Sequence, residues 1–205
     1  MYNIGDRLVY PMHGAGIIEA IEEKEVLYEK RFYYVMKMPV SDVKVMIPVN
    51  NTEEIGLREV SSREKAEEVL VKFTETGADT SSNWNKRYRE NMVKIRSGEL
   101  MDIAYVAKTL MLKEKMKGLS MGERKMLSST KQILVSELVI ALDTTADELM
   151  AKLDGIVAAD LESANANEAA TTAAEEVTVP STFEIKVETP EPKKEEVKEE
   201  ELVEA

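Results

Sequence analysis

The first 60 residues alternate short apolar runs with turn-forming residues. The runs are rich in β-branched and aromatic side chains and occupy residues 8–10, 17–21, 32–38 and 43–49. Pro11, Gly14 and Gly16 separate the first two runs, and Pro39 closes the third. Proline and glycine at such positions favour tight turns between strands. Several short strands in about 60 residues predict a small β-barrel of the SH3 or Tudor type.

The fourth run predicts a strand with two different faces. Lys44, Met46 and Pro48 fall on one face, and the apolar residues between them fall on the other. Because proline has no amide hydrogen to donate, Pro48 should lie at a sheet edge or where the strand leaves the sheet.

Residues 61–160 change to the period of amphipathic helices. Ser61 with Glu64 matches a capping box, and apolar residues follow it at helical spacing. A second helix is expected to begin near Ser82. Further boxes at Ser120 and Thr145 open two more helices, and the first three predicted helices end at Gly77, Gly98 and Gly118. The pattern predicts a compact helical domain of about five helices.

Residues 161–205 consist mainly of Ala, Glu, Thr, Pro and Lys, with Phe183 as the single aromatic residue. This composition buries too little apolar area to offset the entropy of an ordered chain. We therefore expect an α+β protein with a β domain over 1–60, a helical domain over 61–160 and a disordered acidic tail over 161–205.

The net charge of −12 is distributed unevenly. Residues 155–205 carry 14 acidic and 4 basic side chains, whereas residues 80–131 carry 12 basic and 5 acidic ones. A basic middle block points to a localised polyanion-binding face. The chain has no Cys, no early apolar segment after a basic start and no run of about 18 apolar residues. We expect a cytoplasmic protein without a signal peptide or a membrane span.

Residues 83–96 combine an aromatic stripe with basic residues. At about 100° per residue, Trp84, Tyr88, Met92 and Ile95 share one side of a helix, and cations flank that stripe. One interpretation makes Trp84 the core tryptophan of the bundle and the cations a solvated face. The other has the cations bind phosphates while the indole wedges or stacks at a base step. The spacing alone leaves both open.

Enzyme signatures are missing from the sequence. Gly14-Ala15-Gly16 lacks the third glycine and the helix of a dinucleotide site, and there is no phosphate-binding P-loop motif. His13 is the single imidazole and lies in a turn without an arguable Ser or Asp partner. We expect a protein that is not an enzyme and that uses no metal and no cofactor.

Three stretches of the chain resemble the CarD/CdnL family of bacterial RNA polymerase-binding transcription regulators. Residues 5–16 are similar to the family's G-D-x-V-V-Y-P-x-H-G opening. Residues 83–91 are similar to its N-W-x-x-R-Y-x-x-N motif, and residues 118–127 to its G-L-S-x-x-E-x-x-M-L motif. Transcription-repair coupling factors share the opening, but the three stretches together, in this order, are specific.

This resemblance implies a Tudor-like domain that docks on the RNA polymerase β subunit and a helical domain that contacts promoter DNA. The family's wedge tryptophan falls on Trp84, and its basic DNA contacts fall on Lys86, Arg87 and Arg89. The DNA contact is expected in the minor groove at the upstream edge of the transcription bubble, with little sequence dependence.

The polymerase contact departs from the family pattern at one position. Where relatives often carry a basic residue before the V/I-P of the third strand, this chain has Met46. Lys24 offers a basic side chain elsewhere, so Lys24, Met46 and Pro48 are the predicted polymerase-binding residues.

The resemblance implies a monomeric regulator that stabilises the promoter open complex without ATP, with ribosomal RNA promoters responding most. Two other functions stay open at this point. One is a protein-only adaptor on RNA polymerase that makes no direct DNA contact. The other is a hydrolase that uses Asp/Glu pairs, which the single His and the lack of a convergent site disfavour.

Overall fold

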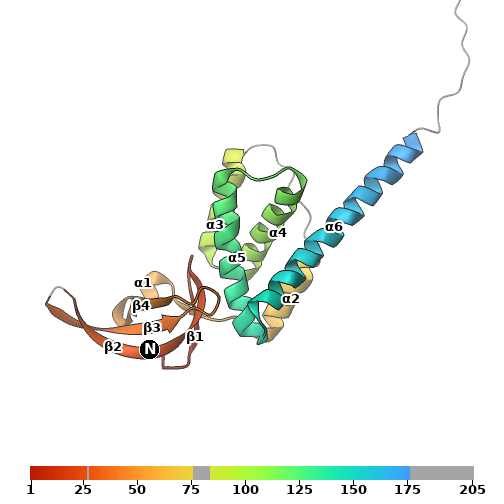
Figure 1. Cartoon of the computed structure of the whole chain (residues 1–205). Coiled ribbons are helices and arrows are strands. Elements are labelled where there is room, and N and C mark those ends of the chain that lie inside the picture. Colours follow the sequence, from red (N-terminus) through yellow and green to blue (C-terminus); the bar gives the residue numbers. More distant parts are fainter. Residues whose placement is uncertain (27, 76–83, 176–205) are drawn as a thin grey trace, which may run out of the picture. The chain divides into compact units, whose positions relative to one another are not determined.

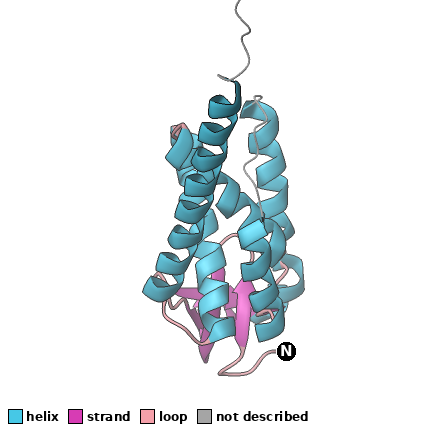
Figure 2. Cartoon of the chain, turned by 90° about the vertical axis from the view of Figure 1, so that its right-hand side faces the viewer, coloured by secondary structure: helices cyan, strands magenta, loops and turns pink. Residues whose placement is uncertain are grey.

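The computed structural model describes residues 1–26, 28–75 and 84–175, while the side chains of Trp84 and of residues 165–175 lie outside the description. Residues 1–166 form one compact unit, in which the strands and the long helices occupy separate regions (Figures 1 and 2). The strand-rich region, called the sheet domain below, contains β1 (Arg7–Tyr10), β2 (Gly14–Val26), β3 (Glu29–Lys37), β4 (Lys44–Pro48), the short α1 (Thr52–Ile55) and β5 (Arg58–Glu59).

The sheet is antiparallel throughout and has the strand order β4-β3-β2-β1-β5, which places β4 and β5 at its edges. On β4, Ile47 is buried and packs against the sheet core, whereas Lys44 and Met46 are exposed. The predicted two-faced strand is therefore confirmed. Pro48 is the last residue of this edge strand, a position at which proline is tolerated.

The helical domain contains five helices in the described part of the chain, in agreement with the predicted α+β architecture. They are α2 (Arg63–Glu75), α3 (Trp84–Ser97), α4 (Leu100–Met116), α5 (Met121–Leu142) and α6 (Ala146–Glu175). Their shared core includes the apolar residues that follow Ser61 at helical spacing, namely Ala66, Val69, Leu70 and Phe73.

The helix ends match the predicted signals with one correction. Ser120 and Glu123 form a capping box at the start of α5, and Gly98 and Gly118 adopt the left-handed conformation after α3 and α4. The predicted box at Ser61 is wrong, because the hydroxyl of Ser62 accepts the Lys65 amide at 3.3 Å and caps α2. The expected stop at Gly77 lies outside the described residues.

Helix α6 continues to Glu175, past the boundary predicted at residue 160. Leu161 still packs against the helical core, and the alanine-rich sequence that follows has high intrinsic helix propensity. The disorder expected over residues 161–205 is therefore wrong for 161–175, which are helical, and residues 176–205 lie outside the description. Of the helices that the structure describes, none combines the length and the apolar character needed to cross a bilayer.

The sheet domain and the helical domain meet along α5. Val9, Ala15 and Ile140 form a small apolar cluster, and the Ala15 amide donates to the Ser136 hydroxyl at 2.8 Å. Gly14 has a positive φ of 108°, and a Cβ there would overlap the Ser136 hydroxyl. The turn glycine of the first sequence motif is thus required by its close approach to α5.

Candidate functional site

Helix α3 presents two faces of different character. Its outer stripe carries the exposed residues Lys86, Arg89, Val93 and Arg96. Tyr88, Met92 and Ile95 instead pack into or against the helical core. At these three positions the aromatic stripe is the face that holds α3 to the bundle, as in the first of the two interpretations left open by the spacing. The side chain of Trp84, the first residue of α3, lies outside the described residues.

Arg87 lies on the inner face, contrary to its expected role as a DNA contact. Its side chain is 6% exposed, and its guanidinium forms an ion pair with Glu123 at 2.9 Å. A buried charge is stable only when it is paired, and here the partner is buried as well. Arg87 therefore supports the packing of the helical domain, and its guanidinium is not exposed to a phosphate.

Glu123 connects three helices. Its carboxylate pairs with Arg87 of α3 and Lys113 of α4 and accepts hydrogen bonds from the amide and the hydroxyl of Ser120, the N-cap of α5. Burial raises the pKa of the Glu123 carboxyl, but the hydrogen bonds from Lys113, Arg87 and Ser120 outweigh it and lower that pKa to about 2. The second and third sequence motifs therefore meet in one buried charged cluster.

The Arg87–Glu123 pair brings the start of α3 beside the start of α5. Several cations at this end of the helical domain are exposed. Lys86 has 71% of its side chain exposed and lies 3.8 Å from Glu90, and Arg89 is also exposed. Nearby α4 and α5 add further exposed cations that the site prediction left out, namely Lys115, Lys117, Arg124 and Lys125. Their combined positive charge suits a polyanion.

On the sheet domain, the structure brings two of the three predicted polymerase-binding residues together. The amine of Lys24 donates to the sulfur of Met46 at 3.2 Å and lies 3.5 Å from the carboxylate of Glu22. Met46 is 37% exposed on the edge strand β4. Pro48 ends the same strand opposite Tyr33. The free edge of β4 and these side chains form one candidate docking surface.

Exposed apolar residues on the opposite face of the sheet, the face that carries the buried Tyr34 and Ile47, were missed by the sequence prediction. Phe32 is 58% and Ile21 is 42% exposed, and both line a pocket of about 230 Å³ together with Tyr34 and Val49. The signal was the length of the second and third apolar runs, because β2 and β3 extend past the core that buries their inner ends.

Comparisons with known proteins agree with this two-part arrangement. Residues 2–61 match the sequence model of the CarD-like/TRCF RID domain, and residues 68–154 match that of the CarD C-terminal domain. The Bacillus subtilis (strain 168) protein named "Putative transcription factor YdeB" is 41% identical over 149 residues, which are 73% of this chain and 97% of YdeB. The chain belongs to the CarD family.

A CarD structure shows a partial overlap with the chain. The solution NMR structure of the 72-residue N-terminal domain of Myxococcus xanthus CarD has 34% sequence identity to it, with a TM-score of 0.26. The match covers 29% of this chain and 79% of that domain. The family assignment rests on the sequence matches instead.

Family membership makes this protein a non-enzymatic transcription regulator tied to RNA polymerase. The boundary between the two CarD domains falls near β5 and the start of α2, where the structure changes from sheet to helices. The predicted polymerase-binding residues lie in the RID domain, and Trp84, Lys86 and Arg89 lie in the CarD C-terminal domain.

Proposed function

We propose that this CarD-family protein binds the β subunit of RNA polymerase through its sheet domain and stabilises the promoter open complex through its helical domain. The observation that carries the proposal is the exposed stripe on α3 with the cations Lys86, Arg89 and Arg96, which begins two residues after Trp84. In a protein tied to polymerase, the polyanion nearest to such a stripe is promoter DNA.

On the DNA side, Lys86 and Arg89 bind phosphates, and Trp84 wedges at a base step of the minor groove. Unstacking a base step costs a few kcal/mol. The wedge therefore favours DNA that has already begun to open, at the upstream edge of the bubble. Because phosphate contacts position a protein without reading sequence, the contact has little sequence dependence.

On the polymerase side, β4 has no second strand neighbour among the described residues, and Lys24 and Met46 lie beside its outer edge. A strand of the β subunit adds to this edge, with the main chain supplying affinity and Met46 and Pro48 supplying apolar contact. This arrangement replaces the basic residue that relatives use before the V/I-P with backbone pairing and apolar area.

The two contacts together explain regulation without ATP. Binding to polymerase raises the effective concentration of a weak DNA contact. A protein that binds the open promoter more tightly than the closed promoter shifts the equilibrium between the two toward the open form. A difference of about 1.4 kcal/mol in binding free energy gives a tenfold shift. Promoters whose open complexes decay quickly respond most.

The competing function is a protein-only adaptor on polymerase. The inward position of Arg87, Tyr88 and Met92 favours it, because it leaves fewer side chains of the second motif for DNA. In that case Trp84 belongs to the core and takes no part in binding.

Fluorescence of the single tryptophan separates the two functions. The protein is titrated with a forked duplex that mimics the edge of the bubble and with a fully paired duplex of the same sequence. We expect a salt-sensitive change in Trp84 emission that is larger with the fork. Emission that resists aqueous quenchers and ignores both DNAs would establish the adaptor.

A further inference from the structure

A charged contact at the domain junction reaches the helix that carries the proposed DNA contacts. Arg58 lies on β5 in the sheet domain, and its two terminal nitrogens each bond one carboxylate oxygen of Glu137 on α5, both at 2.8 Å. Glu137 is fully buried on a mainly apolar face of α5, whereas the side chain of Arg58 is 32% exposed. Bidentate arginine–carboxylate pairs fix geometry in addition to charge.

The same guanidinium extends to the end of α3. One nitrogen of Arg58 donates to the carbonyl of Gly98 at 2.7 Å. Gly98 is buried, has a left-handed φ of 72° and follows the last residue of α3. A side chain of the polymerase-binding domain is therefore bonded to the C-terminal end of the helix whose first turns carry Lys86 and Arg89.

Glu137 also holds the segment between the two domains. Its carboxylate accepts hydrogen bonds from the amide of Ser61 at 3.1 Å and from the hydroxyl of Ser61 at 2.8 Å. The sheet edge, the connecting segment and the end of α3 thus meet on one buried carboxylate and its arginine partner.

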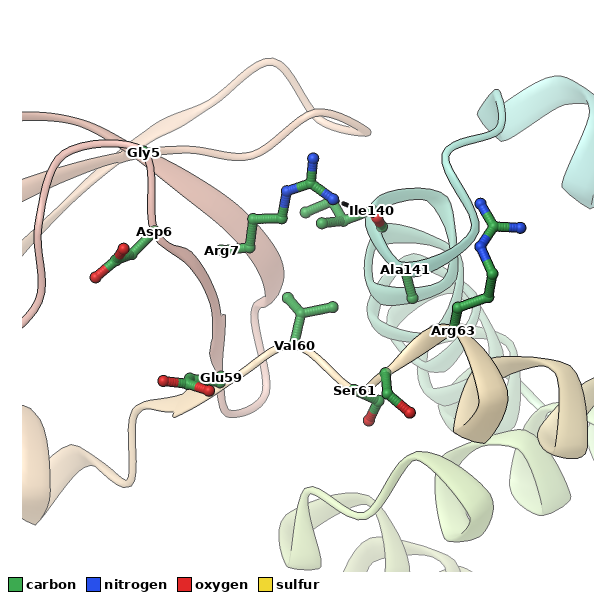
Figure 3. Close-up of a pocket in the computed structure, with 10 residues that line it drawn as sticks. Gly5, Asp6, Arg7, Glu59, Val60, Ser61, Arg63, Ile140 and Ala141 are labelled. Carbon is green, nitrogen blue, oxygen red and sulfur yellow. Dashed lines mark hydrogen bonds between the residues drawn. The ribbon is translucent and has the colours of Figure 1, made fainter.

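Other contacts join the domains without reaching α3. The guanidinium of Arg7 donates to the carbonyl of Ile140 on α5 at 3.1 Å, across a cavity of about 520 Å³ that Val60 and Arg63 also line (Figure 3). These contacts hold the sheet domain against α5 and supply a matched comparison for Arg58.

We propose that Arg58 and Glu137 are positioning residues that set the direction in which α3 is presented relative to the sheet domain. The inference deepens the proposed function and rests on it. When the sheet domain is anchored on polymerase, the helical domain meets DNA at a high effective concentration only if its orientation lets both domains bind at once. Loosening α3 therefore weakens the DNA contact of the anchored protein without changing either binding surface.

Two kinds of variant test this positioning role. Arg58→Lys keeps the positive charge but cannot bond both Glu137 oxygens and the Gly98 carbonyl at once. The double variant Arg58→Met with Glu137→Met removes the whole contact and leaves no lone buried charge, so it folds even if the single variant does not. Arg7→Met is the matched control, because it removes an arginine bond to α5 that does not touch α3.

Three measurements are made on the full chain. The Arg58 variants should bind purified RNA polymerase, and promoter DNA alone, with affinities within about twofold of wild type. Both proposed binding surfaces are intact in these variants. Open-complex lifetime is expected to fall about threefold to tenfold in both Arg58 variants, because a flexible connection still retains part of the effective concentration. The Arg7 control should keep the wild-type lifetime.

Domain orientation gives an independent readout. Residual dipolar couplings should fit one alignment tensor in wild type and require two in the Arg58 variants. An unchanged domain orientation in the Arg58 variants overturns the positioning role. So does a wild-type open-complex lifetime in Arg58 variants whose domains are loosened, provided that Trp84→Ala shortens that lifetime. If the variants loosen and neither they nor Trp84→Ala alters the lifetime, the proposed function fails while the junction assignment stands.

Discussion

The inner and outer faces of α3 both carry basic side chains, but these side chains have different roles. Arg87 on the inner face is buried against Glu123, whereas Lys86 and Arg89, its close neighbours in sequence, are exposed. The inner cation joins the cluster around Glu123 that connects three helices, and the outer cations are exposed to solvent, with Lys86 beside Glu90. A motif made of nearly consecutive residues therefore contains both a structural support of the helical domain and the proposed DNA contacts.

Removing the inner cation should have the largest effect. We expect Arg87→Ala to lower the free energy of unfolding by about 3 kcal/mol, because it breaks a buried ion pair and leaves part of the Glu123 charge uncompensated. Arg89→Ala should stay within about 0.5 kcal/mol of wild type, as is usual for an exposed position. Urea unfolding of both variants measures this difference, and equal losses would show that the two faces are not distinct.

Acid should weaken the inner cluster next. The folded-state pKa of Glu123, about 2, lies below its ordinary value of 4.5, so this carboxylate stabilises the fold above about pH 4.5. That contribution, on the order of 3 kcal/mol, is lost as the pH falls through this window toward 2. The free energy of unfolding should lose this part of its pH dependence in Glu123→Gln, and an unchanged acid profile would contradict the assignment.

The outer cations should affect DNA binding and leave stability alone. Lys86→Ala with Arg89→Ala removes two proposed phosphate contacts, so the slope of log affinity against log salt should become shallower by about 2 and the affinity should fall about tenfold. Lys65→Ala with Lys72→Ala removes two exposed cations of α2 and should leave the slope unchanged. Fluorescence anisotropy with labelled promoter DNA measures both, and identical slopes would make the outer face an ordinary solvated surface.

The smallest expected effect lies on the sheet domain. Met46→Ala removes apolar area beside the free β4 edge and should weaken polymerase binding about fivefold, or about 1 kcal/mol. Val43→Ala changes a similarly exposed apolar residue outside β4 and is the matched control. If both variants bind polymerase equally, as measured by surface plasmon resonance, the docking surface lies elsewhere.

Local patterns predicted most of the fold. The alternation along β4, the capping box at Ser120 and the glycine stops at Gly98 and Gly118 all reflect interactions within a few residues, and all appear in the structure. The misplaced cap at Ser61 shows the limit of such patterns. Its hydroxyl is taken by Glu137, 76 residues away, and no local rule contains that competitor.

The candidate site could be predicted only in part for the same reason. Helical spacing placed Arg87 beside the aromatic stripe but not its partner Glu123, which lies 36 residues further along the chain. Glu137 carried a usable signal, since a carboxylate in an apolar helix face needs a buried partner. Nothing in the sequence identified Arg58 as that partner.

The lifetime of the promoter open complex in the presence of Trp84→Ala tests the central claim most directly. Purified RNA polymerase, saturated with wild type or variant, is challenged with a competitor that traps released enzyme. The account predicts a lifetime shorter by about tenfold with the variant, equivalent to about 1.4 kcal/mol, while affinity for polymerase is unchanged. Equal lifetimes with both proteins bound would contradict it.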